Sequence, residues 1–542
     1  MAMATFAGMI LNWTAPLLLI AVLALAAVGT QSLMTIPWEG LLLTFGAVTL
    51  VSMLVYAFCL RYQARAGGWF FGMVTAVTAF ILFLWFLAWL HDGAYGPIIA
   101  MYWKIPALLG TAVTALPSII RFIPVLRKPE VRRVVLKVIL GLAGLIVPVG
   151  AIALLFWMYD LGRMQSVPAA AVYNPLHYAD GYVTLLVLTA VFTFVAVFLL
   201  NVNLTAPHRL YRDQLARTFI HRGRKAADTA PIPLSKINNR NFAPYHLINA
   251  TLNLPSSESP ALRERRSDFF LFSKHFCGAP SIGYFETPSW VAGKAQVDLA
   301  TAMAVSGAAA SSHMGLGSIP TLSALLTLLN IRLGYWIRRP GKGWSKTPGF
   351  ICLIREMFGI CMSEKDGWFN LSDGGHIENM GVYELLRRRC KFIISVDGEA
   401  DPESTFHGHL TLVRHAQIDF GVRIETNLTN VRADATTKLS QSHSMMCRIH
   451  YPDGKIGLLL YLKLSVTGDE PELIKNYRAF NPDFPHQTTL DQFFEEDQFE
   501  AYRQLGVHVA EGLFSPALLG KKTHPDNTKT WFASLARNVC AY

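Results

Sequence analysis

The chain has 542 residues, of which 52% are apolar and 16% charged, and its formal net charge is +11. This length predicts two or three structural units, and the apolar fraction points to a membrane component. Much of the positive charge stands next to apolar segments and no nucleic-acid motif is present, so the basic balance favours anionic lipid over nucleic acid as a partner.

Six apolar segments in residues 1–204 are each long enough to be considered as membrane-spanning helices, which need about 20 apolar residues. The fourth contains Lys104, Pro106 and Pro117, so an interfacial or re-entrant helix is its alternative. The six predicted spans are residues 7–29, 39–60, 69–91, 98–120, 134–158 and 182–203.

The distribution of Lys and Arg predicts the orientation of these spans. Basic residues concentrate after the second, fourth and sixth segments, whereas the other connections hold almost none. The positive-inside rule then places both ends of the region on the cytoplasmic side. We therefore predict an integral membrane protein with about six transmembrane helices and a cytoplasmic C-terminal domain.

Residues 205–243 differ in composition from the apolar segments before them. The stretch from His208 to Phe219 has the pattern of a basic helix, which we expect to leave the membrane and lie along the lipid headgroups. Residues 223–241 are polar with prolines and are typical of a linker.

Residues 244–542 alternate between strand-like and helix-like patterns, which predicts a layered α/β domain. The apolar run 392–396 has the length of a strand covered on both faces. The other expected strands are 245–252, 268–272 and 458–466, and the expected helices are 299–307, 321–333 and 495–512. The fold class predicted for the whole chain is thus a multi-span α-helical membrane region followed by an α/β domain.

The stretch Ser372-Asp373-Gly374-Gly375-His376 combines an acidic residue with two glycines just before a predicted helix. Glycine accepts backbone dihedrals that other residues avoid, so a carboxylate placed there can come close to another group. Glu378 and Asn379 then fall where acidic and capping side chains suit the free N–H groups of a helix start. Taken alone, the stretch is also consistent with an ordinary tight turn.

Three kinds of site compete for these residues. Ser306 lies among small residues, which a nucleophile elbow requires, but the full G-x-S-x-G is absent. Asp373, His376 and Glu378 contain the H-x-E of zinc deaminases without the P-C-x-x-C pair, and the seven scattered cysteines include no C-x-x-C. The glycines of residues 341–343 lack the rest of a phosphate-binding loop.

The Asp373-Gly374-Gly375 motif, followed by Glu378-Asn379, resembles the catalytic-aspartate motif of patatin-like phospholipases and their cytosolic phospholipase relatives. The resemblance covers most of residues 205–515 and is to a bacterial, membrane-attached branch of that family. The further blocks that carry it are residues 247–253, 270–273, 301–309, 330–336 and 484–494.

This resemblance implies hydrolysis of phospholipid or lysophospholipid esters by a Ser–Asp dyad, without a metal or an organic cofactor. Asp373 would be the base, Gly374 and Gly375 would form its turn, and Ser306 is the tentative nucleophile. The implied partners are a membrane lipid substrate and the bilayer, and the implied location is a bacterial inner membrane.

The chain departs from the family pattern at its nucleophile. Family members carry a glycine-rich oxyanion loop and a G-x-S-x-G serine before the Asn249-Ala250-Thr251 block, and neither occurs in this sequence. Three explanations stay open: the nucleophile lies on an upstream polypeptide, the chain is a catalytically inactive scaffold, or Ser306 has been recruited.

Overall fold

The fold is that of a computed structural model, which divides into two compact units. One unit consists of residues 2–205 with 349–351, and the other of residues 206–348 and 352–542. The described residues are 14–29, 40, 46–48, 50, 51, 53, 73–74, 76–87, 89–91, 150–163, 181–220, 231–237, 244–292, 295–309, 311, 327, 330, 332–342, 347–487, 494–514 and 527–539.

The predicted membrane region is wrong for the helices that the structure describes. None of them combines the length and the apolar character that crossing a bilayer requires. Helix α2 (Thr14–Gly29) has 16 residues, which at 1.5 Å per residue is short of a hydrocarbon core about 30 Å thick. Helix α7 (Gly181–Phe194) passes into a π-helical turn (Val195–Leu199), and the backbone is extended at Leu200.

This finding also overturns the predicted integral location in a bacterial inner membrane. The predicted span 98–120 lies outside the described residues, as do most of 39–60 and the first half of 134–158. In the first unit, apolar side chains of α2, α7 and residues 150–163 pack on one another, including Ala21, Phe156 and Leu185. Its last helix is α8 (Val202–Thr205).

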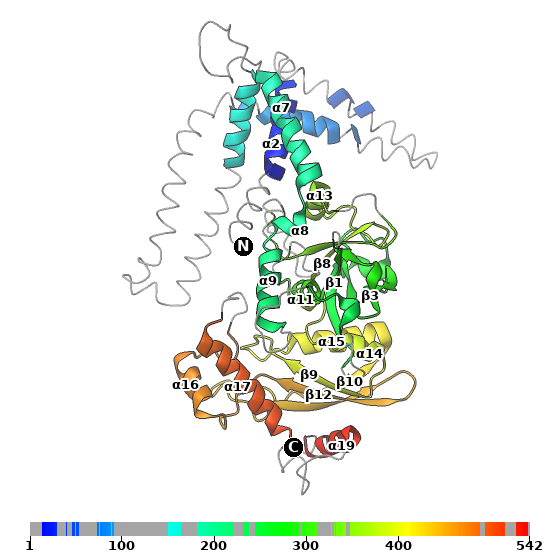
Figure 1. The fold of residues 1–542 in the computed structure, drawn as a ribbon, viewed down its shortest axis with the longest axis vertical. Coiled ribbons are helices and arrows are strands. Elements are labelled where there is room, and N and C mark those ends of the chain that lie inside the picture. Colours follow the sequence, from blue (N-terminus) through cyan, green and yellow to red (C-terminus); the bar gives the residue numbers. More distant parts are fainter. Residues whose placement is uncertain are drawn as a thin grey trace. The chain divides into compact units, whose positions relative to one another are not determined.

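A six-stranded antiparallel sheet organises the first half of the second unit (Figure 1). Its centre is β1 (Leu247–Asn253), which pairs with β2 (Ser267–Ser273) on one side and β8 (Trp368–Asp373) on the other. The remaining strands are β3 (Phe276–Ala279), β4 (Gly283–Glu286) and β7 (Tyr335–Arg338), in the order β4-β3-β2-β1-β8-β7.

One face of this sheet packs against α11 (Leu299–Ser306) and the residues around Trp290. Alternate strand residues such as Leu252 and Phe270 point to that face because side chains alternate across a strand. Short elements complete this part of the unit. They are the 3₁₀ turns Leu234–Lys236 and Thr287–Ser289, α10 (Pro260–Arg263), β5 (Val291–Ala292), β6 (Ala295–Gln296) and α13 (Phe350–Phe358).

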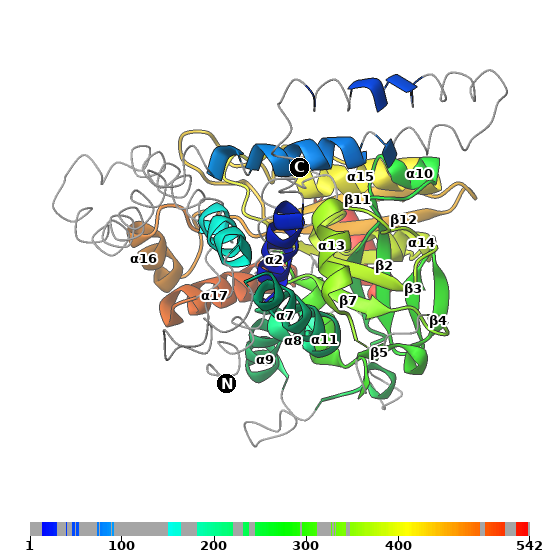
Figure 2. The same cartoon turned by 90° about the horizontal axis from the view of Figure 1, so that it is seen from above.

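The opposite face of the sheet carries a helical layer, which a second sheet covers from the other side (Figures 1 and 2). The helices are α14 (Tyr383–Arg387) and α15 (His407–Phe420). Phe269 of β2 stacks on Tyr383, and Leu412 of α15 packs in the same cluster as Leu459 of the second sheet. The two sheets are therefore joined through a shared apolar layer.

The second sheet has the order β10-β11-β12-β9, with β9 and β12 parallel and the other pairs antiparallel. Its outer face packs on three C-terminal helices through Leu460, Leu505 and Leu535. The elements are β9 (Phe392–Asp397), β10 (Arg423–Glu425), β11 (Ser444–His450), β12 (Ile456–Lys463), α16 (Glu472–Phe480), α17 (Glu496–Gly512) and α19 (Thr528–Val539).

The strands and helices predicted from local pattern are confirmed except in two respects. Strand β9 is an edge strand whose Ile394 and Val396 are 46% and 63% exposed, so the prediction of a strand covered on both faces is wrong. The helix expected at 321–333 falls mostly outside the described residues.

Helix α9 (His208–Phe219) has the predicted bounds but not the predicted surroundings. His208 is buried with its Nδ1 2.7 Å from the Leu333 carbonyl, and Arg212 pairs with Asp298, the residue that caps α11. The basic side chain of Arg212 thus serves to attach the helix to α11. The expectation that α9 lies along lipid headgroups is replaced by a packed position within the α/β unit.

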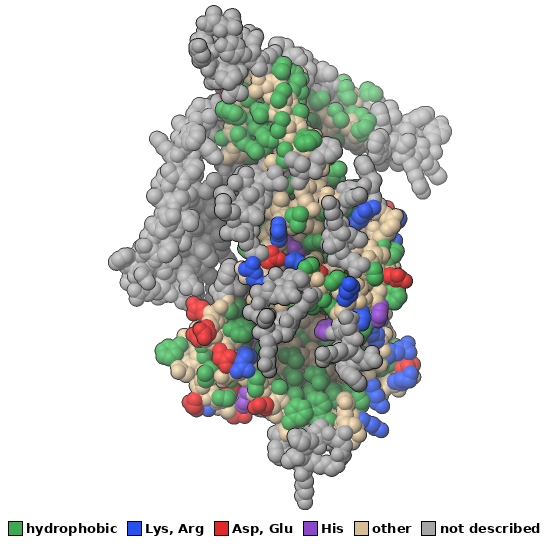
Figure 3. Space-filling view, viewed as in Figure 1, with side chains coloured by type: hydrophobic (Ala, Val, Ile, Leu, Met, Phe, Trp, Pro, Cys, Tyr) green, Lys and Arg blue, Asp and Glu red, His purple; other side chains and the backbone are tan. Residues whose placement is uncertain are grey.

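The basic run Arg387-Arg388-Arg389 is likewise tied into the structure. Arg387 and Arg388 both pair with the buried Glu384, and Arg389 lies 3.0 Å from Asp453. Lys and Arg side chains gather along the edge of the unit beside α14 (Figure 3). Partner carboxylates therefore offset part of the positive charge there.

Candidate active site around Asp373

Asp373 is the last residue of β8, and two hydrogen bonds and the turn that follows it fix its position. Its side chain accepts a hydrogen bond of 2.7 Å from the N–H of Gly375, and its own carbonyl accepts one of 2.7 Å from the Thr251 hydroxyl. The 3₁₀ turn Gly374–His376 begins directly after it. A Cβ on Gly374 would stand 2.9 Å from the backbone oxygen of Asn249, so the close approach to β1 requires glycine.

The carboxyl group of Asp373 is half-buried, and this burial raises its pKa. The Gly375 N–H and the nearby His376 act in the opposite direction because both favour the charged form. A carboxyl group with a raised pKa holds a proton more readily near neutral pH than an exposed one, which is a property of a general base.

Ser306 is the last residue of α11 and is half-buried. No hydrogen bond joins it to Asp373 in the part of the chain that the structure describes, but Tyr211 of α9 links their surroundings. The Tyr211 hydroxyl donates to the carbonyl of Gly307, at 3.0 Å, and its pKa is raised by burial and by the charge of Asp373. Tyr211 thus interacts both with the residue after Ser306 and with Asp373. The sequence motifs did not single out this tyrosine.

The contacts of His376 were also not evident from the sequence motif. Its Nε2 lies 3.2 Å from the Ala309 carbonyl, which can only accept, so Nε2 carries the proton. Its Nδ1 then accepts from the Ser372 hydroxyl at 2.9 Å, and Ser372 in turn accepts from the Asn253 amide at 3.0 Å. Ser372 is fully buried, so this serine–histidine pair holds the turn in place rather than facing a substrate.

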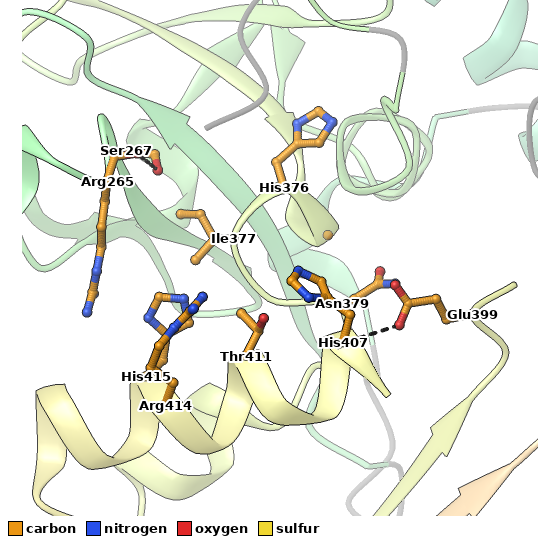
Figure 4. Close-up of a pocket in the computed structure, with 12 residues that line it drawn as sticks. Arg265, Ser267, His376, Ile377, Asn379, Glu399, His407, Thr411, Arg414 and His415 are labelled. Atoms are coloured by element: carbon orange, nitrogen blue, oxygen red, sulfur yellow. Dashed lines mark hydrogen bonds between the residues drawn. The ribbon is translucent and has the colours of Figure 1, made fainter. Parts of the chain in front are cut away.

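A cavity of about 310 Å³ opens beside the same turn (Figure 4). Gly375, His376 and Asn379 line one side of it, and α15 lines the other. The residues contributed by α15 are His407, Gly408, Thr411, Arg414 and His415, which recur at helical spacing on one face.

The charges around this cavity are mixed. Arg265 is held by Asp419 through two hydrogen bonds of 2.7 Å, whereas Arg414 makes no ion pair among the described residues. Glu399 reaches the cavity from the opposite side, and burial raises its pKa. His415 is buried, which together with the two arginines lowers its pKa to about 4, so it is neutral near pH 7. Arg414 therefore brings to the cavity a positive charge that is not paired with a carboxylate among the described residues.

The metal alternative built from Asp373, His376 and Glu378 is not supported by this geometry. Both ring nitrogens of His376 have hydrogen-bond partners, and Asp373 faces the N–H of Gly375. Glu378 instead accepts from the N–H of Met380 at 2.5 Å, at the start of the segment leading into α14. Gly341 and Lys342 form a turn after β7, and Gly343 lies outside the described residues.

Glu378 should give the stability of the fold a measurable pH dependence. Burial raises its pKa from 4.5 to about 7, although four backbone N–H groups oppose the shift. A raised carboxyl pKa means that the folded state binds the proton more tightly. Its stabilising contribution is therefore full below pH 4.5 and is lost as the pH rises through about 7.

We expect Glu378→Gln to remove this pH dependence of the unfolding free energy. Relative to the variant, the original chain should lose on the order of 3 kcal/mol of unfolding free energy as the pH rises from 4.5 to about 7. Urea unfolding followed by tryptophan fluorescence measures the difference, and the exposed Glu403→Gln serves as the control. A constant difference between the two chains over this range would contradict the assignment.

No protein-family model, curated protein or solved structure matches this chain. The family suggested by the Asp-Gly-Gly motif therefore remains a prediction from the residues.

Proposed function

We propose that this chain is an acyl-ester hydrolase of the patatin-like type, with Asp373 as its general base. The observation that supports the proposal best is the half-buried Asp373 carboxyl, which the Gly374–Gly375 turn presents beside Tyr211. A carboxylate in an ordinary surface turn would have no reason to be desolvated in this way.

The reaction would follow the usual course of acyl transfer through a serine. The hydroxyl of Ser306 gives its proton to the Asp373 carboxylate while its oxygen forms a bond to the ester carbonyl carbon. The tetrahedral oxyanion collapses, the C–O bond to the alcohol breaks, and Asp373 returns the proton to the leaving oxygen. Water then attacks the acyl-enzyme while Asp373 accepts a proton from it. The bond between the acyl carbon and the Ser306 oxygen breaks, Asp373 returns the proton to that oxygen, and the fatty acid is released.

The proposed substrates are phospholipid or lysophospholipid esters. Support comes from the cavity beside Gly375, in which Arg414 offers a positive charge for an anionic group near the ester. The cavity is small relative to a whole lipid, so only the headgroup side of the substrate would be enclosed.

The alternative is a catalytically silent binding protein that keeps the same turn. The missing hydrogen bond between Ser306 and Asp373 among the described residues favours it. The two functions differ in whether ester bonds are cleaved, which makes the test direct.

The test measures fatty-acid release by the purified full-length chain from phospholipid vesicles, lysophospholipid micelles and a soluble p-nitrophenyl ester. Asp373→Asn is expected to lower kcat by roughly 10²–10⁴-fold, the usual contribution of a general base. Asp453→Asn, at an exposed ion pair with Arg389, is the matched control and should leave the rate unchanged.

The outcome for Ser306→Ala tests the recruited serine. Loss of activity supports Ser306 as the nucleophile. Activity that survives Ser306→Ala but not Asp373→Asn retains the base and rejects this serine. Absence of release from every substrate overturns the hydrolase for this chain by itself, and leaves the silent binding protein and a nucleophile on another polypeptide.

A further inference from the structure

Four side chains with metal-binding atoms converge near the outer helices of the second sheet. They come from three segments: His443 precedes β11, Asp469 and Glu470 lie between β12 and α16, and His508 is on α17 (Figure 1). One ligand atom from each lies within 4.8 Å of all the others. None of these residues belongs to the Asp373 region or its cavity.

The imidazole of His443 is oriented so that Nε2 faces the cluster, 3.1 Å from the Thr467 hydroxyl. The Ser465 hydroxyl donates to the carbonyl of Lys463 at 3.4 Å, so it accepts from His443 Nδ1 at 3.1 Å. Nε2 is then the unprotonated nitrogen. A histidine that binds a metal through one nitrogen while the other donates to a fixed acceptor is the usual arrangement in protein metal sites.

Three acceptor atoms lie close to the hydroxyl of Thr467. Its single hydroxyl proton faces Asp469 Oδ1 at 2.5 Å, His443 Nε2 at 3.1 Å and Glu470 Oε1 at 3.3 Å. Glu470 is buried and also accepts from the N–H groups of Thr467 and Gly468, which fix its orientation. His508 Nε2 lies 3.2 Å from Asp469 Oδ1. Because a carboxylate only accepts, His508 Nε2 donates this hydrogen bond, and an ion that binds there would displace its proton. The two carboxylates and two imidazoles thus converge on one region as candidate ligands.

We propose that His443, Asp469, Glu470 and His508 form a binding site for a divalent transition-metal ion of the zinc type. Two imidazoles favour such an ion over Ca²⁺ or Mg²⁺, which prefer oxygen ligands.

Closing the site around an ion requires only modest side-chain movement. Ligands about 2.0 Å from a tetrahedral zinc lie roughly 3.3 Å apart, closer than the largest separation in the cluster. The Asp469 side chain is 74% exposed and is free to rotate inward. Because the ligands join the loop after β12 to α17, the ion would have a structural role.

The site is tested by titrating the untagged, full-length, metal-depleted chain with Zn²⁺ in a calorimeter and with Co²⁺ in a visible spectrometer. We expect one ion per chain, a rise in Tm on binding, and the visible absorption of tetrahedral Co²⁺. The double variant His443→Gln/His508→Gln should weaken binding at least 100-fold. The control His450→Gln, whose ring pairs with Glu425 outside the cluster, should bind as the original chain does.

A second variant tests the site even if the double variant does not fold. Ser465→Ala leaves every ligand in place but removes the acceptor that orients His443, and it should weaken binding by roughly 10–100-fold. The proposal is overturned if the original chain binds no Zn²⁺ at a 1:1 ratio, or if the double variant and the control bind equally well.

Discussion

Arg332→Met is expected to lower the free energy of unfolding by about 3–5 kcal/mol, the usual cost of removing one partner from a buried ion pair. Arg332 and Glu356 are both fully buried, and Arg332 Nε lies 3.1 Å from Glu356 Oε2. Without the guanidinium, the carboxylate loses its positively charged partner, although it still accepts a hydrogen bond of 2.7 Å from the Trp336 indole. A buried carboxylate in that position must either stay charged at high cost or take up a proton.

Urea unfolding monitored by circular dichroism measures this effect. Adding Glu356→Gln to Arg332→Met should restore much of the lost stability, because Gln removes the charge and still accepts from Trp336. The exposed pair on α17 supplies the control: Arg503→Met breaks an ion pair with Glu500 and should cost far less than Arg332→Met, because solvent screens an exposed pair. A similar cost for Arg332→Met and Arg503→Met would show that the buried pair contributes no more than a surface one.

Gly374→Ala is expected to reduce the proposed hydrolytic rate by about 100-fold or more and to destabilise the fold by roughly 1–3 kcal/mol. The new Cβ would meet the Asn249 backbone oxygen at 2.9 Å and its carbonyl carbon at 3.2 Å. Asn249 belongs to the central strand β1, which is paired on both sides and cannot move without breaking its ladder. The Asp373 turn must therefore shift instead, taking the carboxylate with it.

Gly506→Ala is the matched control for this substitution. Gly506 lies inside α17, where an added Cβ meets nothing within 4 Å, so alanine should stabilise the helix by about 0.5–1 kcal/mol. Fatty-acid release and unfolding free energy are measured for both variants. A Gly374→Ala chain that keeps the full rate would contradict the role given to this turn.

Most of the secondary structure of the α/β unit could be predicted from the sequence because it depends on local pattern. The apolar runs from Phe269 to Phe272 and from Leu458 to Leu462 mark strands, and Asp298 before an apolar segment marks the start of α11. The helix at 208–219 was predicted with its observed bounds for the same reason. The glycines after Asp373 indicated a tight turn, and the approach to Asn249 explains why they are needed.

The predicted membrane spans failed because hydropathy measures composition and not where a helix ends. The apolar segment 182–203 does begin as a helix, but the backbone becomes extended at Leu200. Strand β9 shows the same limit, since an apolar run does not reveal that alternate residues, Ile394 and Val396, lie on an exposed face. The basic residues of α9 gave no sign that Arg212 pairs with Asp298, 86 positions away.

The sequence by itself determined the local elements and the Asp-Gly-Gly turn, because these follow from backbone preferences and from side-chain periodicity within a few residues. The tertiary structure alone decided what surrounds that turn. Tyr211 of α9 and Arg414 of α15 reach the neighbourhood of this turn from other elements, and His443 meets His508 across 65 positions only because α17 packs on β12. Such meetings depend on long-range packing, which no local pattern encodes.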